Sequence, residues 1–370
     1  MMPGTARYPN FVVLLLLLLP LSLIACAGGG NSGDGDGKRS EDSDGVGGGT
    51  DSSGDGSAAN DSSGNTSGAP GSSGGGSGDG TGGTGPGTTE EGYRKTGSDK
   101  WQVMNSGSFN TLANVWGSGP DNLYAVGVLG AALHFDGNAW TTLVFDTESS
   151  FTDVWGSSAT DVYIVGWERC YHYDGIRWQQ LPLPGGVGIS SVWLDAPGNV
   201  YVLDVQDRIY RRANGGAWEL VYQDPGNTIQ DLFQIRGSAP DSIYVAGVPS
   251  LTFNGRDWSV VDLGTSDNGS LSVWVNSARD VYYLVGDDVY HFDGNGWSVS
   301  HTGAGVPMKR IWGQSWNAVF VVGDGIFRFD GAGWTSDIDR ETGSIYGIWG
   351  ASATEVFGVG ESGRAVHYVP

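Results

Sequence analysis

Basic side chains, histidine and cysteine are scarce in this chain of 370 residues. It has 19 Lys and Arg against 41 Asp and Glu, which gives a formal net charge of -22, together with five His and two Cys. A chain this acidic is repelled by phosphate backbones and by anionic lipid head groups. The composition therefore argues against nucleic-acid binding and against simple electrostatic docking on a membrane.

Long hydrophobic runs and helical periodicity are also missing. The longest apolar run, Phe11 to Leu19, is too short to span a bilayer. It follows Arg7 and precedes Pro20 and a group of small residues, which is the pattern of a secretory signal peptide. The chain is therefore predicted to be exported.

The segment after the apolar run reads Leu23-Ile24-Ala25-Cys26. It resembles the lipobox of bacterial lipoproteins, in which the chain is cut before the Cys and the Cys thiol is diacylated. The resemblance implies a signal peptide over residues 1–25 and lipidation of Cys26; a plain cleavage site or an uncleaved anchor are the alternatives. Ala27 is similar to the residue that directs lipoproteins to the outer membrane of Gram-negative cells, which implies that location, on either its periplasmic or its outer side.

The two cysteines offer no disulfide framework for such an exported chain. Lipidation of Cys26 would leave Cys170 without an intramolecular partner. We therefore expect an apolar core to stabilise the protein, although the compartment permits disulfides.

Residues 26–99 consist mainly of Gly, Ser, Asp and Thr. Such a composition cannot bury enough apolar surface to offset chain entropy, so we predict a disordered linker. A Gly/Ser coil of this length has a root-mean-square span of roughly 45 Å, enough to hold a domain clear of a membrane surface.

Residues 100–370 contain a repeat of roughly 39 residues that occurs seven times. Six of the seven units have an anchor Trp, in strings such as Val-Trp-Gly, and Arg236 stands in the one vacant place. The anchor tryptophans are Trp116, Trp155, Trp193, Trp274, Trp312 and Trp349. An aromatic residue stands eight positions after every anchor: Tyr124, Tyr163, Tyr201, Tyr244, Tyr282, Phe320 and Phe357.

Each unit contains four short segments rich in Val, Leu, Tyr, Phe and Trp, separated by turn residues such as Asp-Gly. Four strands per unit of about 40 residues indicate a propeller blade. The last unit ends at "RAVHYVP", after its third strand, and "DKWQVMNSG" around Trp101 provides a fourth strand at the start. We predict an all-β fold, a seven-bladed β-propeller of four-stranded antiparallel blades, closed by pairing of this N-terminal strand with the last blade.

The repeat resembles bacterial WD-repeat, YVTN and neuraminidase-repeat-like propellers over residues 100–370. The strings "IYRRANGGAW" (209–218) and "IFRFDGAGW" (326–334) are also similar, more faintly, to tectonin lectin repeats. These resemblances imply the propeller architecture. They leave a glycan-active enzyme and a lectin as alternative functions.

Four histidines share one column of the third strands, and no catalytic motif accompanies them. A seven-fold rotation spreads equivalent positions around the ring, so they cannot converge on one metal ion. We expect them to pack and to hydrogen-bond a neighbouring blade or turn, with Arg212, Thr252 and Arg328 as approximate counterparts. The four are His134, His172, His291 and His367. No catalytic residue, metal or cofactor is therefore predicted.

The candidate binding site is the string "GWERC" with Trp167, Glu168 and Arg169, in a loop from a second to a third strand. Trp167 lies outside both tryptophan columns, and an aromatic beside charged groups can stack on a sugar or anchor a protein partner. The alternative is a Trp folded over its own blade. Residues two before each anchor would line a central channel if the first strand is innermost: Asn114, Asp153, Ser191, Gln234, Ser272 and Arg310.

Taken together, the sequence predicts a monomeric, lipid-anchored cell-envelope propeller that serves as a binding or scaffold module for an envelope protein or a glycan. An enzyme would show acids and arginines gathered in one pocket, and a lectin would show similar shallow sites in each blade. A scaffold would show one broad irregular patch.

Overall fold

The computed structural model describes residues 93–95, 100–226, 228–229, 231–266, 269–338 and 343–370. The predicted signal peptide, Cys26 and nearly all of the predicted linker lie outside these residues. No helix in the described part of the chain is long and apolar enough to cross a lipid bilayer.

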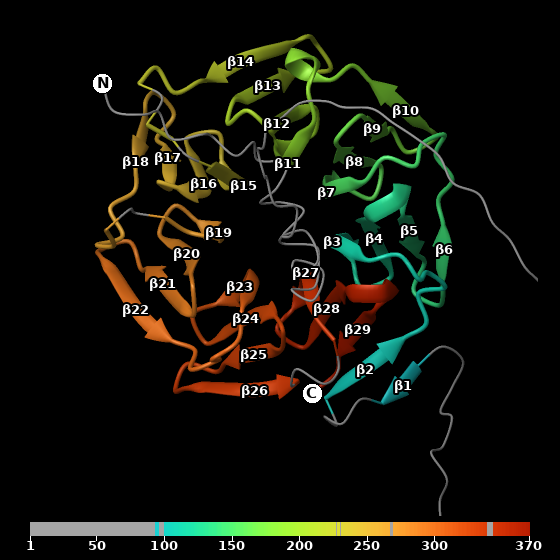
Figure 1. Ribbon diagram of the computed structural model, residues 1–370, viewed down its shortest axis with the longest axis vertical. Helices are drawn as coiled ribbons and strands as arrows, with labels where there is room; N and C mark the ends of the chain where they lie inside the picture. The colour runs from blue at the N-terminus through green and yellow to red at the C-terminus, as the bar shows by residue number, and fades with distance from the viewer. Residues whose placement is uncertain (1–92, 96–99, 227, 230, 267–268, 339–342) are drawn as a thin grey trace, which may run out of the picture. The chain divides into compact units, whose positions relative to one another are not determined.

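Seven antiparallel sheets stand around a common axis, which confirms the predicted seven-bladed propeller (Figure 1). The first strand of each blade is innermost. These strands are β3 (Leu112–Gly119), β7 (Phe151–Ser158), β11 (Ile189–Ala196), β15 (Asp231–Ala239), β19 (Ser272–Ser277), β23 (Met308–Ser315) and β27 (Ile345–Ser352).

The second and third strands follow outward from the axis. The second strands are β4 (Asn122–Gly127), β8 (Asp161–Gly166), β12 (Asn199–Asp204), β16 (Ser242–Val248), β20 (Asp280–Val285), β24 (Ala318–Gly323) and β28 (Glu355–Gly360). The third strands are β5 (Ala132–Phe135), β9 (Cys170–Tyr173), β13 (Ile209–Ala213), β17 (Leu251–Phe253), β21 (Asp288–Phe292), β25 (Ile326–Phe329) and β29 (Ala365–Tyr368).

The fourth strands form the outer rim, and each begins at a Trp. They are β2 (Trp101–Met104), β6 (Trp140–Thr142), β10 (Trp178–Leu181), β14 (Trp218–Tyr222), β18 (Trp258–Val260), β22 (Trp297–His301) and β26 (Trp334–Ile338).

The ring closes as predicted, because β2 pairs with β29 in the register Trp101 to Tyr368. A further short strand, β1 (Tyr93–Lys95), pairs with the outer edge of β2 and makes the closing sheet five-stranded. Trp101 is completely buried, whereas Trp140 at the same position of the next fourth strand is half-buried. β2, which also pairs with β1, is thus more deeply buried at its Trp than its counterpart β6 in the next blade.

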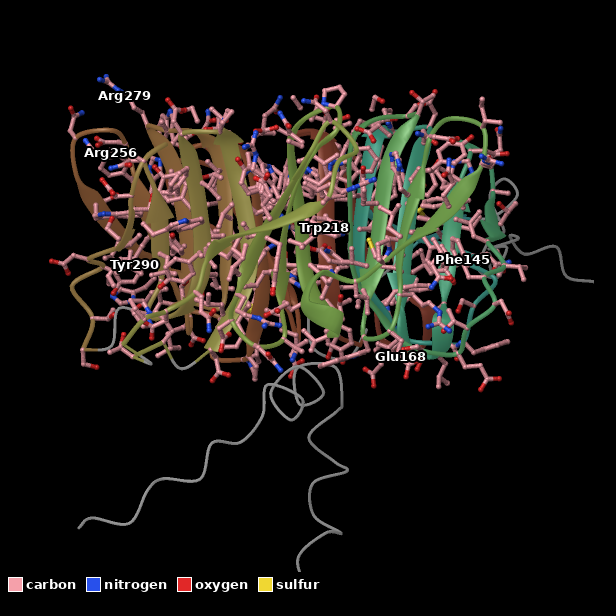
Figure 2. All side chains as sticks on the ribbon, turned by 90° about the horizontal axis from the view of Figure 1, so that it is seen from above. Phe145, Glu168, Trp218, Arg256, Arg279 and Tyr290 are labelled. Carbon is pink, nitrogen blue, oxygen red and sulfur yellow. The ribbon has the colours of Figure 1, made fainter. Side chains whose placement is uncertain are left out.

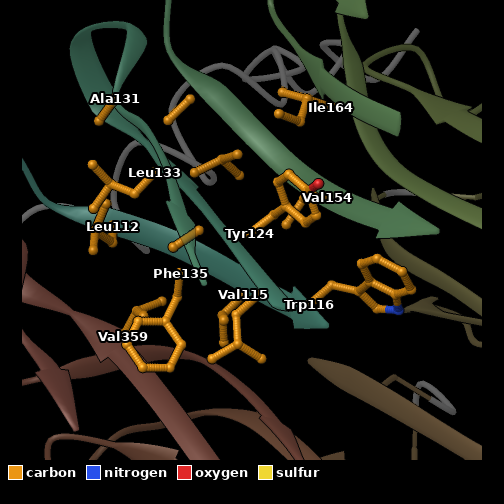
Figure 3. Packing of buried hydrophobic residues seen from close by; sticks show 14 of the residues in the cluster. Leu112, Val115, Trp116, Tyr124, Ala131, Leu133, Phe135, Val154, Ile164 and Val359 are labelled. Carbon is orange, nitrogen blue, oxygen red and sulfur yellow. The ribbon is translucent and has the colours of Figure 1, made fainter. Parts of the chain in front are cut away.

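The two inner aromatic columns face each other in every blade. Each anchor residue pairs across the sheet with the aromatic eight positions later, for example Trp116 with Tyr124 and Arg236 with Tyr244. Buried side chains from neighbouring sheets then pack together, as Figure 3 shows for Val359, Phe135 and Ile164 of three successive blades. The core therefore lies between the blades, as expected for large aromatics that recur once per repeat.

The Asp-Gly turns also have the predicted role. Asp136 Oδ1 accepts hydrogen bonds from the backbone N–H of Asn138 and Ala139, both at 2.9 Å. Gly137 follows with a φ of +93°, which favours glycine. Asp174, Asp293 and Asp330 make the same pair of bonds, so these carboxylates serve the hairpins.

Candidate functional site

The propeller has two faces with different connections. The loops from second to third strands and from fourth strands to the next blade lie on one face, named here the loop face. The tight turns lie on the other, named the turn face. In Figure 2 Glu168 lies at the rim of the loop face, while Arg256 and Arg279 lie at the opposite rim.

Backbone hydrogen bonds tie several loops of the loop face into one surface. The Thr111 carbonyl accepts from Val128 N–H at 3.0 Å. Ser150 joins the next two loops, because its carbonyl accepts from Trp167 N–H at 3.3 Å and its Oγ accepts from Leu129 N–H at 3.3 Å. We call residues 106–111, 128–131, 147–150 and 166–169 the loop strip.

The predicted site residues sit together at one end of this strip. Trp167 and Arg169 are half-buried and Glu168 is exposed. The Arg169 guanidinium donates to the Glu168 carbonyl at 3.0 Å. The Trp167 backbone lies so close to Gly188 that a Cβ there would come within 2.8 Å of the Trp167 carbonyl oxygen, so the next blade supports this loop.

Two exposed apolar side chains of the strip were missed by the sequence reasoning. Phe109 is 94% exposed and Leu129 is 64% exposed. Leu129 adopts φ +54° and ψ +40° within the single turn η2 (Val128–Gly130), a left-handed conformation that costs a Leu roughly 1–2 kcal/mol. The available signal was an apolar residue in each of the loops "NSGSFN" and "GVLGA".

The first strand is innermost as expected, and most residues two before each anchor are buried, while Arg310 is half-buried. Asn114, Asp153, Ser191, Gln234 and Ser272 are each at most 4% exposed. Side chains of this column accept hydrogen bonds from backbone N–H groups of the next blade. The bonds are Val192 N to Asp153 Oδ2 at 3.0 Å, Ile235 N to Ser191 Oγ at 3.2 Å, Val273 N to Gln234 Oε1 at 3.0 Å and Ile311 N to Ser272 Oγ at 3.3 Å.

Most anchor tryptophans lie on a glycine of the following blade. A Cβ on Gly156 would come within 2.5 Å of the Trp116 ring, and one on Gly237 within 2.7 Å of Trp193. Leu194 and Val275 take the place of this glycine in two blades. The anchors of the blades before these two are Trp155 and Arg236. These two anchors therefore have no glycine of the following blade to pack on.

Trp155 and Arg236 lie together with Trp274 at the axis of the ring. The rings of Trp155 and Trp274, from opposite sides of the propeller, have centroids 6.0 Å apart. The Arg236 guanidinium lies 4.3 Å from the centroid of Trp155, a cation–π distance. The irregular residues of the repeat therefore converge in one place.

Arg236 also forms an ion pair with Asp153, and both side chains are at most 4% exposed. Burial would raise the pKa of Asp153, but the charges of Arg236 and Arg310 and the hydrogen bond from Ser191 outweigh it and hold the pKa below its usual range. The carboxylate is therefore ionised at neutral pH.

The four histidines bond the residue that closes the turn between the first and second strands of their own blades, which agrees with the turn alternative and not with a neighbouring blade. His172 Nε2 lies 2.7 Å from Asp161 Oδ1 at the start of the second strand, and its ring stacks on Tyr163. His134, His291 and His367 bond Asn122, Asp280 and Glu355 in the same way. In the third blade the counterpart is Arg211, which faces Tyr201, and not Arg212 as expected.

Other reactive groups are placed apart from one another. Cys170 is a free, fully buried thiol whose pKa burial raises to about 12. Trp316 is 58% exposed and lies beside Gly331, on the turn face. Within the residues described, no three His, Cys, Asp or Glu side chains are grouped so that they could hold a metal ion.

Solved structures of the same fold are numerous, although no family profile and no curated protein sequence matches this chain. YCF48 bound to a D1 peptide is 18% identical over 74% of this chain and 97% of its own, with a TM-score of 0.61. A streptogramin B lyase is 12% identical over 75% and 100%, with a TM-score of 0.63. The WD40 repeats of RRP9 are 9% identical over 73% and 98%, with a TM-score of 0.61.

At these identities the likeness shows the propeller fold alone. The neighbours include a peptide-bound propeller and a lyase, so the fold by itself favours neither binding nor catalysis.

Proposed function

We propose that this propeller is a lipid-anchored cell-envelope module that binds an exported protein partner through the loop strip. The observation that carries the proposal is the pair of exposed apolar side chains, Phe109 and Leu129, held by hydrogen-bonded loops on the same surface as Trp167. Exposed apolar groups on an ordered surface are typical of protein interfaces, whose central contacts are often aromatic.

The conformation of Leu129 strengthens this proposal. A left-handed backbone favours Gly or Asn, and a buried Leu would at least gain packing energy in return for the strain. Leu129 is largely exposed, so within the free protein the strain has no such compensation. A partner that covers Leu129 would provide it.

The distribution of these groups favours a protein over the alternatives. A lectin of repeated sites would present the same side chains in each blade, whereas Phe109, Leu129 and Trp167 occur in three different loops and are not part of any column. A sugar site also needs hydrogen-bonding groups around its aromatic platform, and Phe109 and Leu129 offer none. The peptide bound to YCF48 is a precedent for peptide binding by this fold.

The test uses the full chain in its own envelope. We expect Phe109→Ser combined with Leu129→Asn to abolish co-purification of the partner and crosslinking to it. Ile176→Ser is the matched control, because Ile176 is 88% exposed in a turn of the turn face. Equal capture by both variants would contradict the proposal, and Trp167→Ala then tests the remaining part of the strip.

The lipid anchor is tested separately. Cys26→Ser should move the protein from the membrane fraction to the soluble fraction after cell lysis, and metabolic labelling with a fatty acid should be lost. Continued membrane association of this variant would contradict the anchor without affecting the proposal for the loop strip. A glycan array probed with the same protein tests the lectin alternative.

A further inference from the structure

The axis of the ring carries an unbalanced positive charge. The seven positions two before the anchors and the seven anchor positions contain three charged residues, Asp153, Arg236 and Arg310. Lys309 precedes Arg310, but its ammonium lies 5.2 Å from the ring of Tyr346 and interacts with Asp324, in a different group. One acid therefore faces two arginines at the axis.

The acceptor positions of the Asp153 carboxylate are all taken by other hydrogen-bond donors. Asp153 Oδ1 accepts from Asn114, from Val154 N–H and from Arg236, and Oδ2 accepts from Ser191, from Val192 N–H and from Arg236. A carboxylate offers about four acceptor positions, and six donors already point at this one. Asp153 thus has no oxygen left for Arg310.

Both arginines retain unused donors. Arg310 is half-buried. Within the described part of the chain, Asp153 is the acid whose charge raises the pKa of Arg310. The Nε of Arg236 is buried and has no hydrogen-bond acceptor there. An arginine whose N–H groups lack acceptors in a partly desolvated place favours an anion.

We propose that a small monovalent carboxylate binds at the axis of the ring, with Arg310 as its main partner and Arg236 contributing its field. A single negative charge balances the excess of one positive charge. The two oxygens of a carboxylate match the parallel N–H groups of a guanidinium. The Trp155 ring, 4.3 Å from the Arg236 guanidinium, provides an apolar surface beside that arginine.

The electrostatics of Arg310 agree with this assignment. Burial lowers the pKa of its guanidinium, Asp153 raises it and the like charge of Arg236 lowers it further. A bound anion would offset the burial and the repulsion together, so binding stabilises the folded protein in proportion to the logarithm of the anion concentration.

The test measures Tm of the full chain against increasing sodium formate, which is a minimal carboxylate. We expect a rise of a few degrees in the wild type that grows with the logarithm of the formate concentration above Kd. Arg310→Met should lose this rise, while Arg256→Met should retain it, because Arg256 lies on the turn face with its side chain 90% exposed. Comparing two variants that each lose one positive charge removes the general effect of salt on stability.

Three outcomes would overturn the proposal: no rise in the wild type, an equal rise in Arg310→Met, or an equal rise with sodium bromide, which would assign a halide instead of a carboxylate. If Arg310→Met does not fold, Arg310→Lys keeps the charge and loses the planar fork. We then expect the apparent formate affinity to fall by about tenfold, and an unchanged affinity would contradict the proposal equally.

Discussion

Replacement of Arg236 by Trp would restore the repeat pattern, and we expect it to destabilise the propeller. The sequence pattern alone suggests the opposite, because six of the seven blades have Trp at this position. Arg236 forms the buried ion pair with Asp153. Removing one partner of a buried pair costs about 3–5 kcal/mol, since the other charge stays buried without compensation.

A steric term adds to this electrostatic term. Anchor rings in other blades occupy the space of a missing Cβ: a Cβ added to Gly156 or Gly350 would lie 2.5 Å or 2.6 Å from the ring. Val275 fills the corresponding space in front of position 236, so the new ring would have to displace a buried side chain. Overpacking of this kind costs about 1–3 kcal/mol, and the two terms together predict a loss of roughly 4–8 kcal/mol.

The two terms separate in combined variants. Adding Val275→Gly to Arg236→Trp should recover the steric part, and adding Asp153→Asn should recover the electrostatic part. Urea unfolding followed by circular dichroism at pH 7 provides the free energies, with coupling expected because the three sites adjoin. The reasoning would be refuted if the free energy of unfolding of the single Arg236→Trp variant lay within about 0.5 kcal/mol of the wild-type value, which is the usual range for neutral surface substitutions.

The Arg236–Asp153 ion pair also predicts how the loss of unfolding free energy depends on pH. The pKa of Asp153 is below its usual range in the folded wild type, so its contribution is present above the unfolded-state pKa and is lost as the pH falls through the folded pKa. In Arg236→Met the carboxyl is buried without its main cation, its pKa rises, and protonation relieves the penalty. We expect the destabilisation of this variant to be smaller at pH 4 than at pH 7, and an equal or larger value at pH 4 would contradict the role of the ion pair.

Three further predictions concern other parts of the fold. Trp101→Ala should cost about 3–5 kcal/mol in urea unfolding, and the half-buried Trp140 should cost clearly less; equal losses would mean that closure does not depend on the buried N-terminal strand. Leu129→Asn should leave the free energy of unfolding unchanged or raise it by up to about 1 kcal/mol, because Asn tolerates the left-handed backbone; a lower Tm would argue that Leu129 packs within the free protein. Cys170, with its pKa raised to about 12 and its side chain fully buried, should react with a thiol reagent at pH 8 only after unfolding, so rapid labelling of the native protein would show that the thiol is accessible.

The propeller could be predicted from the sequence because its requirements recur. Six of the seven blades have an aromatic pair across their two inner strands, and every blade has a Trp at the start of its outer strand. Seven repetitions make these positions visible, and the missing strand after "RAVHYVP" with the extra one at Trp101 indicates closure. The separation of the four histidines from one another follows from symmetry in the same way, since each bonds a residue of its own blade.

The irregular positions were only partly predictable. Trp167 stands out in the sequence because it is an aromatic outside the columns, but Phe109 and Leu129 become distinctive only when their exposure and backbone are known. The extra residue in the turn after Arg212 also moves Arg211 into the histidine column, and counting from the Trp cannot reveal such a shift.

The sequence by itself determined the blade number, the four strands of each blade and the closure of this protein, because local pattern and repetition specify how each sheet is built. The tertiary structure alone decided what happens where the repeat fails. Leu194, Val275 and Arg236 look like three unrelated exceptions along the chain. Only the ring places Trp155 and Trp274 against each other and Arg236 against Asp153, because side chains from opposite blades come within contact distance only at the axis.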